Sequence, residues 1–174
     1  MDSQGLLLAQ LEDAHSVLNG TVGDLTPELT HWAPPGIALP IGATLAHIVV
    51  GEDRQVNGIL CSAPPLHAAA FEGKTGLGQL PPPAGQDYSA WAANLAVDLD
   101  ALRQYTSAVQ QQTVSYVKSL APSALGGEID LSAFHLGMRT VDWVLGCIVV
   151  THINNHLGEI SCLKGLQGAK GYPF

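Results

Sequence analysis

The sequence has few charged residues and no excess of basic ones. Only 13% of its 174 residues are charged, whereas 47% are hydrophobic, and this balance excludes an intrinsically disordered chain. The formal net charge of −8 argues against nucleic acid and anionic membranes as partners, because both require a basic footprint. A low charge fraction also leaves much surface for protein contacts, so the composition favours self-association, with a homodimer as the expected form.

Cysteine is also scarce, and no targeting segment is evident. The three cysteines are odd in number and lack metal-site spacing, so a reduced, cytoplasmic setting suits them better than a disulfide scaffold. We expect Cys147 and Cys162 to pack in the core. The N-terminus has no basic region before an apolar run, which argues against a signal peptide. The longest apolar stretch, 141–153, is interrupted and too short for a bilayer span, so we expect a soluble protein.

Apolar periodicity predicts an all-α domain that spans residues 1–174. Helical repeats cover four segments, at about 3–20, 41–61, 88–121 and 140–165. Capping residues support two starts, with Asp2 or Ser3 before the first helix and Thr140 before the last. Four long helices with one long connection indicate a four-helix bundle.

The connections between these helices are rich in proline and glycine. Residues 62–87 predict a long crossover, which is also long enough to serve as a lid or a dimer contact. Thr26 and Pro27 predict the start of a short additional helix. The segment Asp130–Phe134 is compatible with a turn or a short strand. We find no internal repeat.

Several ionisable residues outside the main motif have structural interpretations. His15 lies at the edge of an apolar stripe and is expected to be partly buried with a local hydrogen bond. His67, in the crossover, is expected to be exposed. Glu52 and Asp53 are able to orient a histidine or bind a ligand, but solvent exposure is the expectation for both.

The motif with the most chemical content is Thr151–Glu159, in the last predicted helix. His152 and His156 are four residues apart, so the two imidazoles lie on one helix face about 6 Å apart along the axis. Imidazoles with this spacing can bind one transition-metal ion, although the pattern also arises by chance. His47 lies close to the apolar face of the second helix and, by itself, is interpreted as a core histidine. If the second and fourth helices run antiparallel side by side, His47 meets the pair at one end of the bundle.

Two segments of the chain resemble a known family. The first is Trp32-Ala33-Pro34-Pro35-Gly36, which leads to Leu45-Ala46-His47, and the second runs from His152 to Ile160 and on to Leu166. Together they resemble the DinB/YfiT-like superfamily, which includes thiol-dependent S-transferases and the metal-binding domain of mycothiol-dependent maleylpyruvate isomerase. The resemblance covers essentially the whole chain, weakly in the first and third predicted helices and well in the two histidine segments.

This resemblance implies a fold and a metal site. The fold would be an up-down-down-up four-helix bundle with its long crossover between helices two and three, often dimeric. His47, His152 and His156 would form a facial metal triad that holds zinc or nickel. Relatives often carry Gln where Glu159 stands, so Glu159 adds a carboxylate near the metal. It would orient a ligating imidazole or act as a general base, although a purely structural role fits it as well; Asn155 and Glu52 are weaker candidates.

Three functions remain open from the sequence. The first is a metal-dependent enzyme that transfers a low-molecular-weight thiol to a small electrophilic molecule, as the resemblance implies. The second is a metal-dependent hydrolase that activates water. The third is a metal-binding or stress-response module without turnover. Only three protein ligands are evident, whereas a structural zinc site normally has four, and this count favours a site open to water or substrate.

Overall fold

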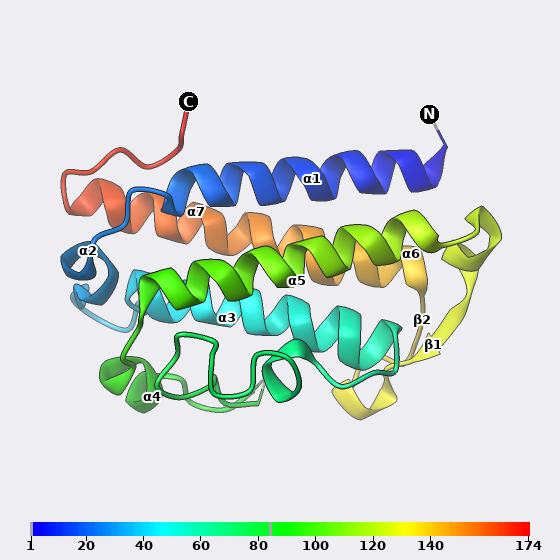
Figure 1. Ribbon diagram of the computed structural model, residues 1–174, viewed down its shortest axis with the longest axis horizontal. Coiled ribbons are helices and arrows are strands. Elements are labelled where there is room, and N and C mark those ends of the chain that lie inside the picture. The colour runs from blue at the N-terminus through cyan, green and yellow to red at the C-terminus, as the bar shows by residue number, and fades with distance from the viewer. Residues whose placement is uncertain (1, 84) are drawn as a thin grey trace.

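The structure is a computed structural model that describes residues 2–83 and 85–174. Most of the described chain is helical, as predicted for the all-α class. Figure 1 shows four long helical segments side by side, namely α1 (Ser3–Val22), α3 (Ile41–Asp53), α5 (Leu99–Ser119) and α7 (Thr151–Leu166). Contacts join α3 to α7, α7 to α1, α1 to α5 and α5 to α3, so a single core is enclosed between them.

The N-terminal helices begin where the capping residues predict. The Asp2 carboxylate accepts a hydrogen bond from the backbone N–H of Gly5 at 2.8 Å and caps α1. Helix α2 (Pro27–His31) has Pro27 in its first turn, and the Thr26 hydroxyl accepts from the backbone N–H of Leu29 at 3.3 Å. These contacts satisfy N–H groups that have no partner inside the helix.

Two of the long helices contain π-helical segments. Helix α3 continues into η1 (Arg54–Leu60), and α6 (Val141–Trp143) continues through η5 (Val144–Val150) into α7. The predicted extents of about 41–61 and 140–165 are therefore confirmed. Each π segment widens the turn to i→i+5 hydrogen bonding, so a residue pattern drawn at 3.6 residues per turn changes face when it crosses one.

The prediction for two cysteines is wrong. Cys147 and Cys162 were expected in the core, but both are exposed. The buried side of the last helix is formed by residues such as Val149, Ile153 and Leu157. The histidine pair lies at the border of this buried stripe and is half-buried.

The predicted third helix is wrong as a single element. It is divided into α4 (Ser89–Asn94) and α5, with an extended break at 95–98. At the break, the backbone N–H of Asp98 donates to the carbonyl of Gly76 at 2.8 Å, and Gly78 donates to Ala96 at 2.9 Å. Gly76 has φ +79° and lies so close that a Cβ there would meet Asp98 backbone at 2.5 Å. The crossover backbone thus replaces helical hydrogen bonds in this segment.

Short elements fill the remaining connections. The crossover includes a 3₁₀ turn, η2 (Leu66–Ala68), and a hairpin of β1 (Glu128–Asp130) and β2 (Met138–Thr140) precedes the last helix. Glu128 pairs with Thr140 and Asp130 with Met138 in antiparallel register. Segment 130–134 is thus the end of a strand followed by a 3₁₀ turn, and the hairpin places Thr140 at the N-cap of α6 as predicted.

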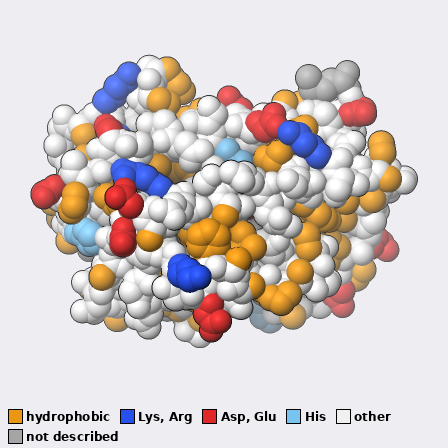
Figure 2. Space-filling model, viewed as in Figure 1, with side chains coloured by type: hydrophobic (Ala, Val, Ile, Leu, Met, Phe, Trp, Pro, Cys, Tyr) orange, Lys and Arg blue, Asp and Glu red, His pale blue; other side chains and the backbone are white. Residues whose placement is uncertain are grey.

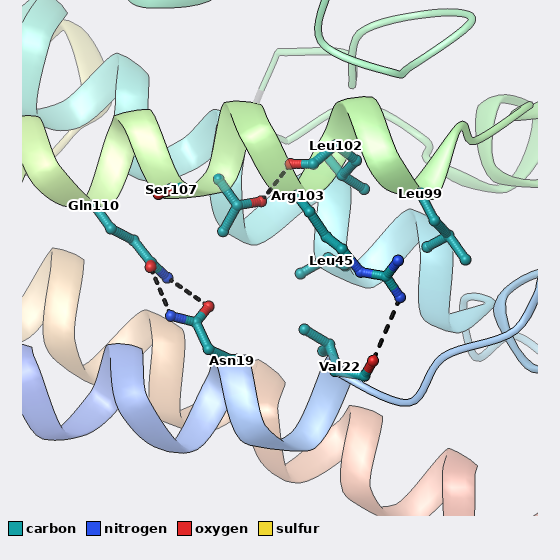
Figure 3. Close-up of a pocket in the computed structure, with 10 residues that line it drawn as sticks. Asn19, Val22, Leu45, Leu99, Leu102, Arg103, Ser107 and Gln110 are labelled. Atoms are coloured by element: carbon teal, nitrogen blue, oxygen red, sulfur yellow. Dashed lines mark hydrogen bonds between the residues drawn. The ribbon is translucent and has the colours of Figure 1, made fainter.

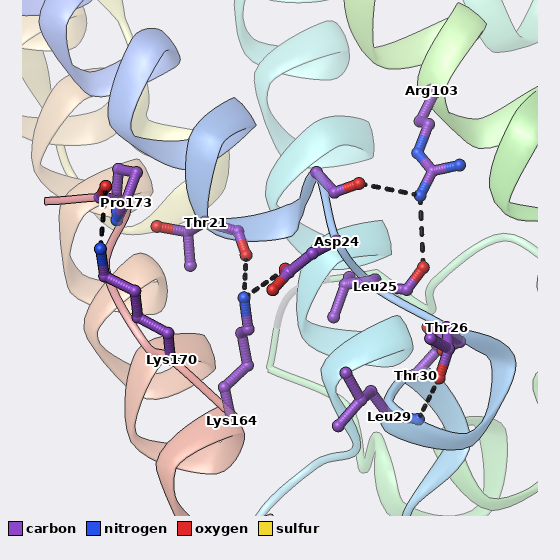
Figure 4. A network of polar contacts seen from close by, with 11 residues as sticks. Thr21, Asp24, Leu25, Thr26, Leu29, Thr30, Arg103, Lys164, Lys170 and Pro173 are labelled. Atoms are coloured by element: carbon purple, nitrogen blue, oxygen red, sulfur yellow. Dashed lines mark hydrogen bonds and ion pairs between the residues drawn. The ribbon is translucent and has the colours of Figure 1, made fainter. Parts of the chain in front are cut away.

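A buried lysine joins the last helix to the end of the first. Lys164 on α7 is 1% exposed, and its ammonium donates to the carbonyl of Thr21 at 2.6 Å and to the carboxylate of Asp24. Figure 4 shows these contacts at the end of α1, beside the C-terminal tail. Nothing in the sequence predicts this role, because a lysine in the last turn of a helix is usually solvated.

The surface agrees with the low charge fraction. On the face shown in Figure 2, the few acidic and basic side chains are spread over the surface, several of them side by side, among polar and hydrophobic ones. Within the described residues, no helix combines the length and the hydropathy that a membrane span requires.

Candidate metal centre

The first half of α3 positions His47 at the edge of the core. The helix is almost wholly buried from Ile41 to Val50, and His47 is its one half-buried position in that stretch. The ring of Tyr88, which follows the long crossover, meets the His47 ring edge-to-face with centroids 5.3 Å apart. The Tyr88 hydroxyl donates to the carbonyl of Pro82 at 3.0 Å. The end of the crossover therefore forms one wall beside His47.

Helix α7 supplies the other two imidazoles. His152 and His156 lie one turn apart, with ring centroids separated by 4.5 Å. Gly51 on α3 allows the two helices to approach, because a Cβ there would come within 3.3 Å of the His152 ring. Contacts between α3 and α7 thus bring together residues more than a hundred positions apart in sequence.

The three imidazoles face one another. Nε2 of His47 and Nε2 of His152 are 2.8 Å apart, and the His47 and His156 ring centroids are 4.8 Å apart. The ligand nitrogens of all three residues lie within 4.8 Å of each other. Two nitrogens that bind one tetrahedral ion lie about 3.3 Å apart, given bonds of about 2.0–2.1 Å. The cluster can therefore hold a metal ion with only a small side-chain adjustment.

The surroundings favour the neutral form of two of these imidazoles. Burial, followed by the neighbouring His156 and by Arg54, lowers the pKa of His47 to about 4, although Glu159 acts in the opposite direction. Burial, His156 and His47 lower the pKa of His152 to about 3. A metal-bound imidazole must be unprotonated at the ligand nitrogen, so these side chains need not lose a proton at neutral pH before they bind an ion.

Glu159 contacts the cluster from outside. Its Oε2 accepts a hydrogen bond from Nδ1 of His156 at 2.7 Å, and its side chain is 59% exposed. This contact places the His156 proton on Nδ1 and leaves Nε2 free as a ligand atom. A carboxylate on the second nitrogen of a ligating imidazole is a common outer contact of metal sites.

The weaker sequence candidates lie elsewhere. Asn155 is exposed. Glu52, expected to be exposed, is instead 2% exposed and contacts His15 Nε2 at 2.9 Å. The His15 contact is long-range rather than local, since it joins α1 to α3. Neither Glu52 nor Asn155 takes part in the three-histidine cluster.

Asp53 and His67 also differ from their expectations. Asp53 is fully buried, and its carboxylate accepts from the Tyr105 hydroxyl at 2.6 Å. It also accepts from the Asn57 amide, from the backbone N–H groups of Leu66 and His67, and from Nδ1 of His67, at 2.8–3.0 Å. Burial alone would raise the Asp53 pKa, but the hydrogen bonds outweigh it and hold the pKa below its ordinary value. His67 is bound by this contact, with a side chain only 10% exposed. The pair fixes the start of the crossover to the end of α3.

Two hollows lie on another side of the molecule, between α1 and α5. One, of about 250 Å³, is lined by apolar residues such as Leu45 and Leu102 and by Arg103. Figure 3 shows it together with Asn19 on α1 and Gln110 on α5, whose side-chain amides exchange hydrogen bonds of 2.8 and 3.2 Å. The second hollow, about 490 Å³, is lined mostly by polar residues. Neither is lined by a histidine of the cluster.

Comparisons with known proteins agree with this fold. A family model described as the DinB superfamily matches residues 10–160. A crystal structure of a conserved protein from Enterococcus faecalis is similar to this chain with a TM-score of 0.72 and 21% identity, covering 95% of this chain and 99% of that one. At this identity the similarity concerns the fold alone. No curated protein matches the chain.

Proposed function

The chain belongs to the DinB superfamily, and we propose that it is an enzyme that depends on a divalent metal ion bound by His47, His152 and His156. The proposed reaction is transfer of a low-molecular-weight thiol to a small electrophilic molecule, with zinc or nickel as the ion. The observation that carries the proposal is the convergence of three imidazoles from α3 and α7 on one point.

The ligand set favours an open site. Zinc in structural sites normally has four protein ligands, whereas catalytic zinc has three and keeps a position for water or substrate. The cluster contains three imidazoles, and among the described residues no cysteine or further carboxylate joins it. Such a set would leave room for a small molecule at the ion.

The residues around the site have separate roles in this proposal. When bound, the ion would supply Lewis-acid chemistry and lower the pKa of a thiol, so that thiolate forms at neutral pH. The S–H bond breaks and its proton passes to solvent, the sulfur forms the new bond to the electrophilic carbon, and the bond from that carbon to its leaving group breaks, so that the leaving group departs to solvent with the electron pair. Glu159 holds the Nδ1 proton of His156 and so orients that imidazole, a positioning role that its contact supports better than a general-base role. Tyr88 forms a wall beside His47.

A binding module without turnover is the second candidate. It is favoured by the two hollows between α1 and α5, since neither is lined by the cluster, and a catalyst needs space for substrate beside its metal. Under this alternative, the metal site has a stress-response or structural role.

We also propose the finer features of the fold. Residues 1–174 would form one four-helix bundle with up-down-down-up topology. In Figure 1, α1 and α7 run toward one end of the molecule, while α3 and α5 run toward the other. The bundle would form a homodimer, which light scattering at several concentrations would test.

The decisive experiment measures metal and turnover together. The wild-type protein is expected to bind about one equivalent of zinc or nickel, and His152→Ala to bind none, because it removes one of three ligands. His31→Ala is the matched control, since His31 is exposed on α2 and contacts only a carbonyl of its own helix. Unchanged metal content in His152→Ala would refute the site.

Turnover separates the functions. The metal-loaded protein is assayed for conjugation of several bacterial thiols to a model electrophile and for hydrolysis of model esters and amides. Thiol-dependent conjugation that His152→Ala abolishes supports the transferase. Hydrolysis alone supports the hydrolase, and bound metal with neither activity supports the binding module.

A further inference from the structure

Arg54 is a cation beside the histidine cluster, and among the described residues no carboxylate forms an ion pair with it. Acidic residues outnumber basic ones by 15 to 7 in the chain, yet only three of the seven basic side chains, Arg103, Lys118 and Lys164, pair with a carboxylate of the described residues. The Arg54 guanidinium instead donates through Nη2 to the backbone carbonyl of Pro81 at 3.1 Å, and in the described chain it forms no ion pair.

The two acidic residues next to Arg54 in sequence contact other partners and form no ion pair with it in the described chain. Glu52 contacts His15, and Asp53 is surrounded by donors from Tyr105, the crossover and Asn57. Both carboxylates are buried, whereas Arg54 is half-buried. The hydrogen bond to Pro81 directs the Arg54 guanidinium toward the crossover.

The contacts of the crossover connect Arg54 to the cluster. Arg54 binds the carbonyl of Pro81, and the next residue, Pro82, accepts the hydrogen bond of Tyr88, whose ring lies against His47. Arg54 also follows His47 by seven residues, which is two helical turns and the same face.

We propose that Arg54 is a specificity residue that binds a carboxylate, or a comparable anionic group, of the small molecule that enters the histidine site. This inference rests on the proposed function, because it adds a substrate class to the same site. Guanidinium has five N–H donors in a planar fork, and the Pro81 carbonyl occupies one of them. The remaining donors suffice for a bidentate contact with a carboxylate.

The charges around the site would orient a bound anionic substrate. A protein with net charge −8 repels anions, and Glu159 adds a negative charge on the α7 side of the cluster. Arg54 and the crossover lie on the α3 side. An anionic substrate would therefore bind with its carboxylate toward Arg54 and its reactive end toward the three imidazoles.

The test compares isosteric ligands that differ in charge. In protein loaded with cobalt(II), binding of mercaptoacetate and of neutral mercaptoacetamide is followed by the sulfur-to-metal absorption band. Arg54→Gln should weaken mercaptoacetate binding about tenfold and change mercaptoacetamide binding less than about twofold. Arg139→Gln is the control, because Arg139 is a cation on the hairpin that stacks on Trp143. Equal effects of Arg54→Gln on the two thiols, or no effect on either, would overturn the assignment, as would loss of metal in Arg54→Gln.

A second measurement does not require metal. Propionate and propionamide are titrated into the metal-free protein while NMR follows the ring signals of Tyr88 and His47. Propionate should cause saturable shifts that Arg54→Gln weakens at least fivefold and Arg139→Gln preserves, and propionamide should cause none. If the wild-type protein does not respond to propionate, or Arg54→Gln responds as wild type does, the Arg54 proposal is wrong. Absence of bound metal with an intact propionate response would instead refute the metal-dependent function alone.

Discussion

Helix α3 contacts histidines in two different ways on neighbouring turns. His15 and His67 each contact a buried carboxylate, Glu52 or Asp53, at 2.9 Å. One to two turns earlier on α3, His47 instead faces the imidazoles of His152 and His156. In the first kind of contact the histidine N–H donates to a carboxylate oxygen, so the hydrogen bond needs no further partner. The second kind of contact brings together three imidazole nitrogens, and burial disfavours a proton on His47 and His152. Unprotonated nitrogens placed in this way can bind a metal cation.

The largest loss of stability is expected when the buried carboxylate of Asp53 is removed. Asp53→Ala should lower the free energy of unfolding by about 3–5 kcal/mol, because it leaves several buried donors without an acceptor, among them Tyr105 and Asn57. Urea denaturation of the metal-free protein measures the loss. Asp87→Ala, which removes an exposed carboxylate that accepts from one backbone N–H, should cost less than about 1 kcal/mol. Equal effects of the two changes would show that the Asp53 contacts do not stabilise the fold.

Substitutions in the His15–Glu52 pair should lower the free energy of unfolding less than Asp53→Ala does. Glu52→Gln keeps an acceptor for His15 and removes the charge, so we expect a loss of about 1–2 kcal/mol in the same measurement. Replacing both residues with leucine should cost less than the sum of the single leucine changes, because no unpaired buried group remains. Strict additivity would indicate that the two side chains do not interact.

The histidine cluster and the buried Asp53 carboxylate should also differ in the pH range over which their contributions to stability are lost. His47 and His152 have folded pKa values of about 4 and 3, below the ordinary 6.5, so the unfolded chain binds more protons as the pH falls below about 6.5. The metal-free protein should therefore lose stability between pH 6.5 and 4, by at most about 1.4 kcal/mol per histidine per pH unit. Asp53 has a lowered pKa, so its contribution is lost only below about 3.8.

Denaturation of the metal-free protein at pH 7 and pH 5 tests this difference. His152→Gln should reduce the loss between these two values, whereas Asp53→Asn should leave it unchanged, since Asp53 is ionised at both. If the loss persists in full in His152→Gln, another group titrates in this range and the assignment to the cluster is wrong.

The sequence predicted the cluster because its signal is local. His152 and His156 are one turn apart, and a helix places such residues on one face whatever else the fold does. His47 required the resemblance as well, since nothing in its own helix distinguishes it from a core histidine. The helical class and most helix limits followed from periodicity and from caps such as Asp2 and Thr26.

What the sequence did not predict depends on contacts between distant segments. Glu52 and Asp53 were expected to be exposed, because their partners come from α1 and from the crossover. The break at 95–98 results from pairing with 76–78, while the apolar repeat continues across it. Cys147 and Cys162 are exposed because each lies away from the buried stripe that includes Leu145, Val149 and Ile153.

The smallest effect is expected where the two kinds of contact meet, at the contact of Glu159 with His156. This is a histidine–carboxylate pair like those of His15 and His67, but its carboxylate is 59% exposed. Glu159→Ala should weaken metal affinity by no more than about tenfold, since water can replace an exposed acceptor. Glu159→Gln should remain close to wild type, because the amide oxygen still accepts from Nδ1. Competition with a chelator measures both affinities. Normal metal affinity in Glu159→Gln combined with lost turnover would instead assign Glu159 as a general base, because an amide can orient the imidazole but cannot accept a proton from the substrate.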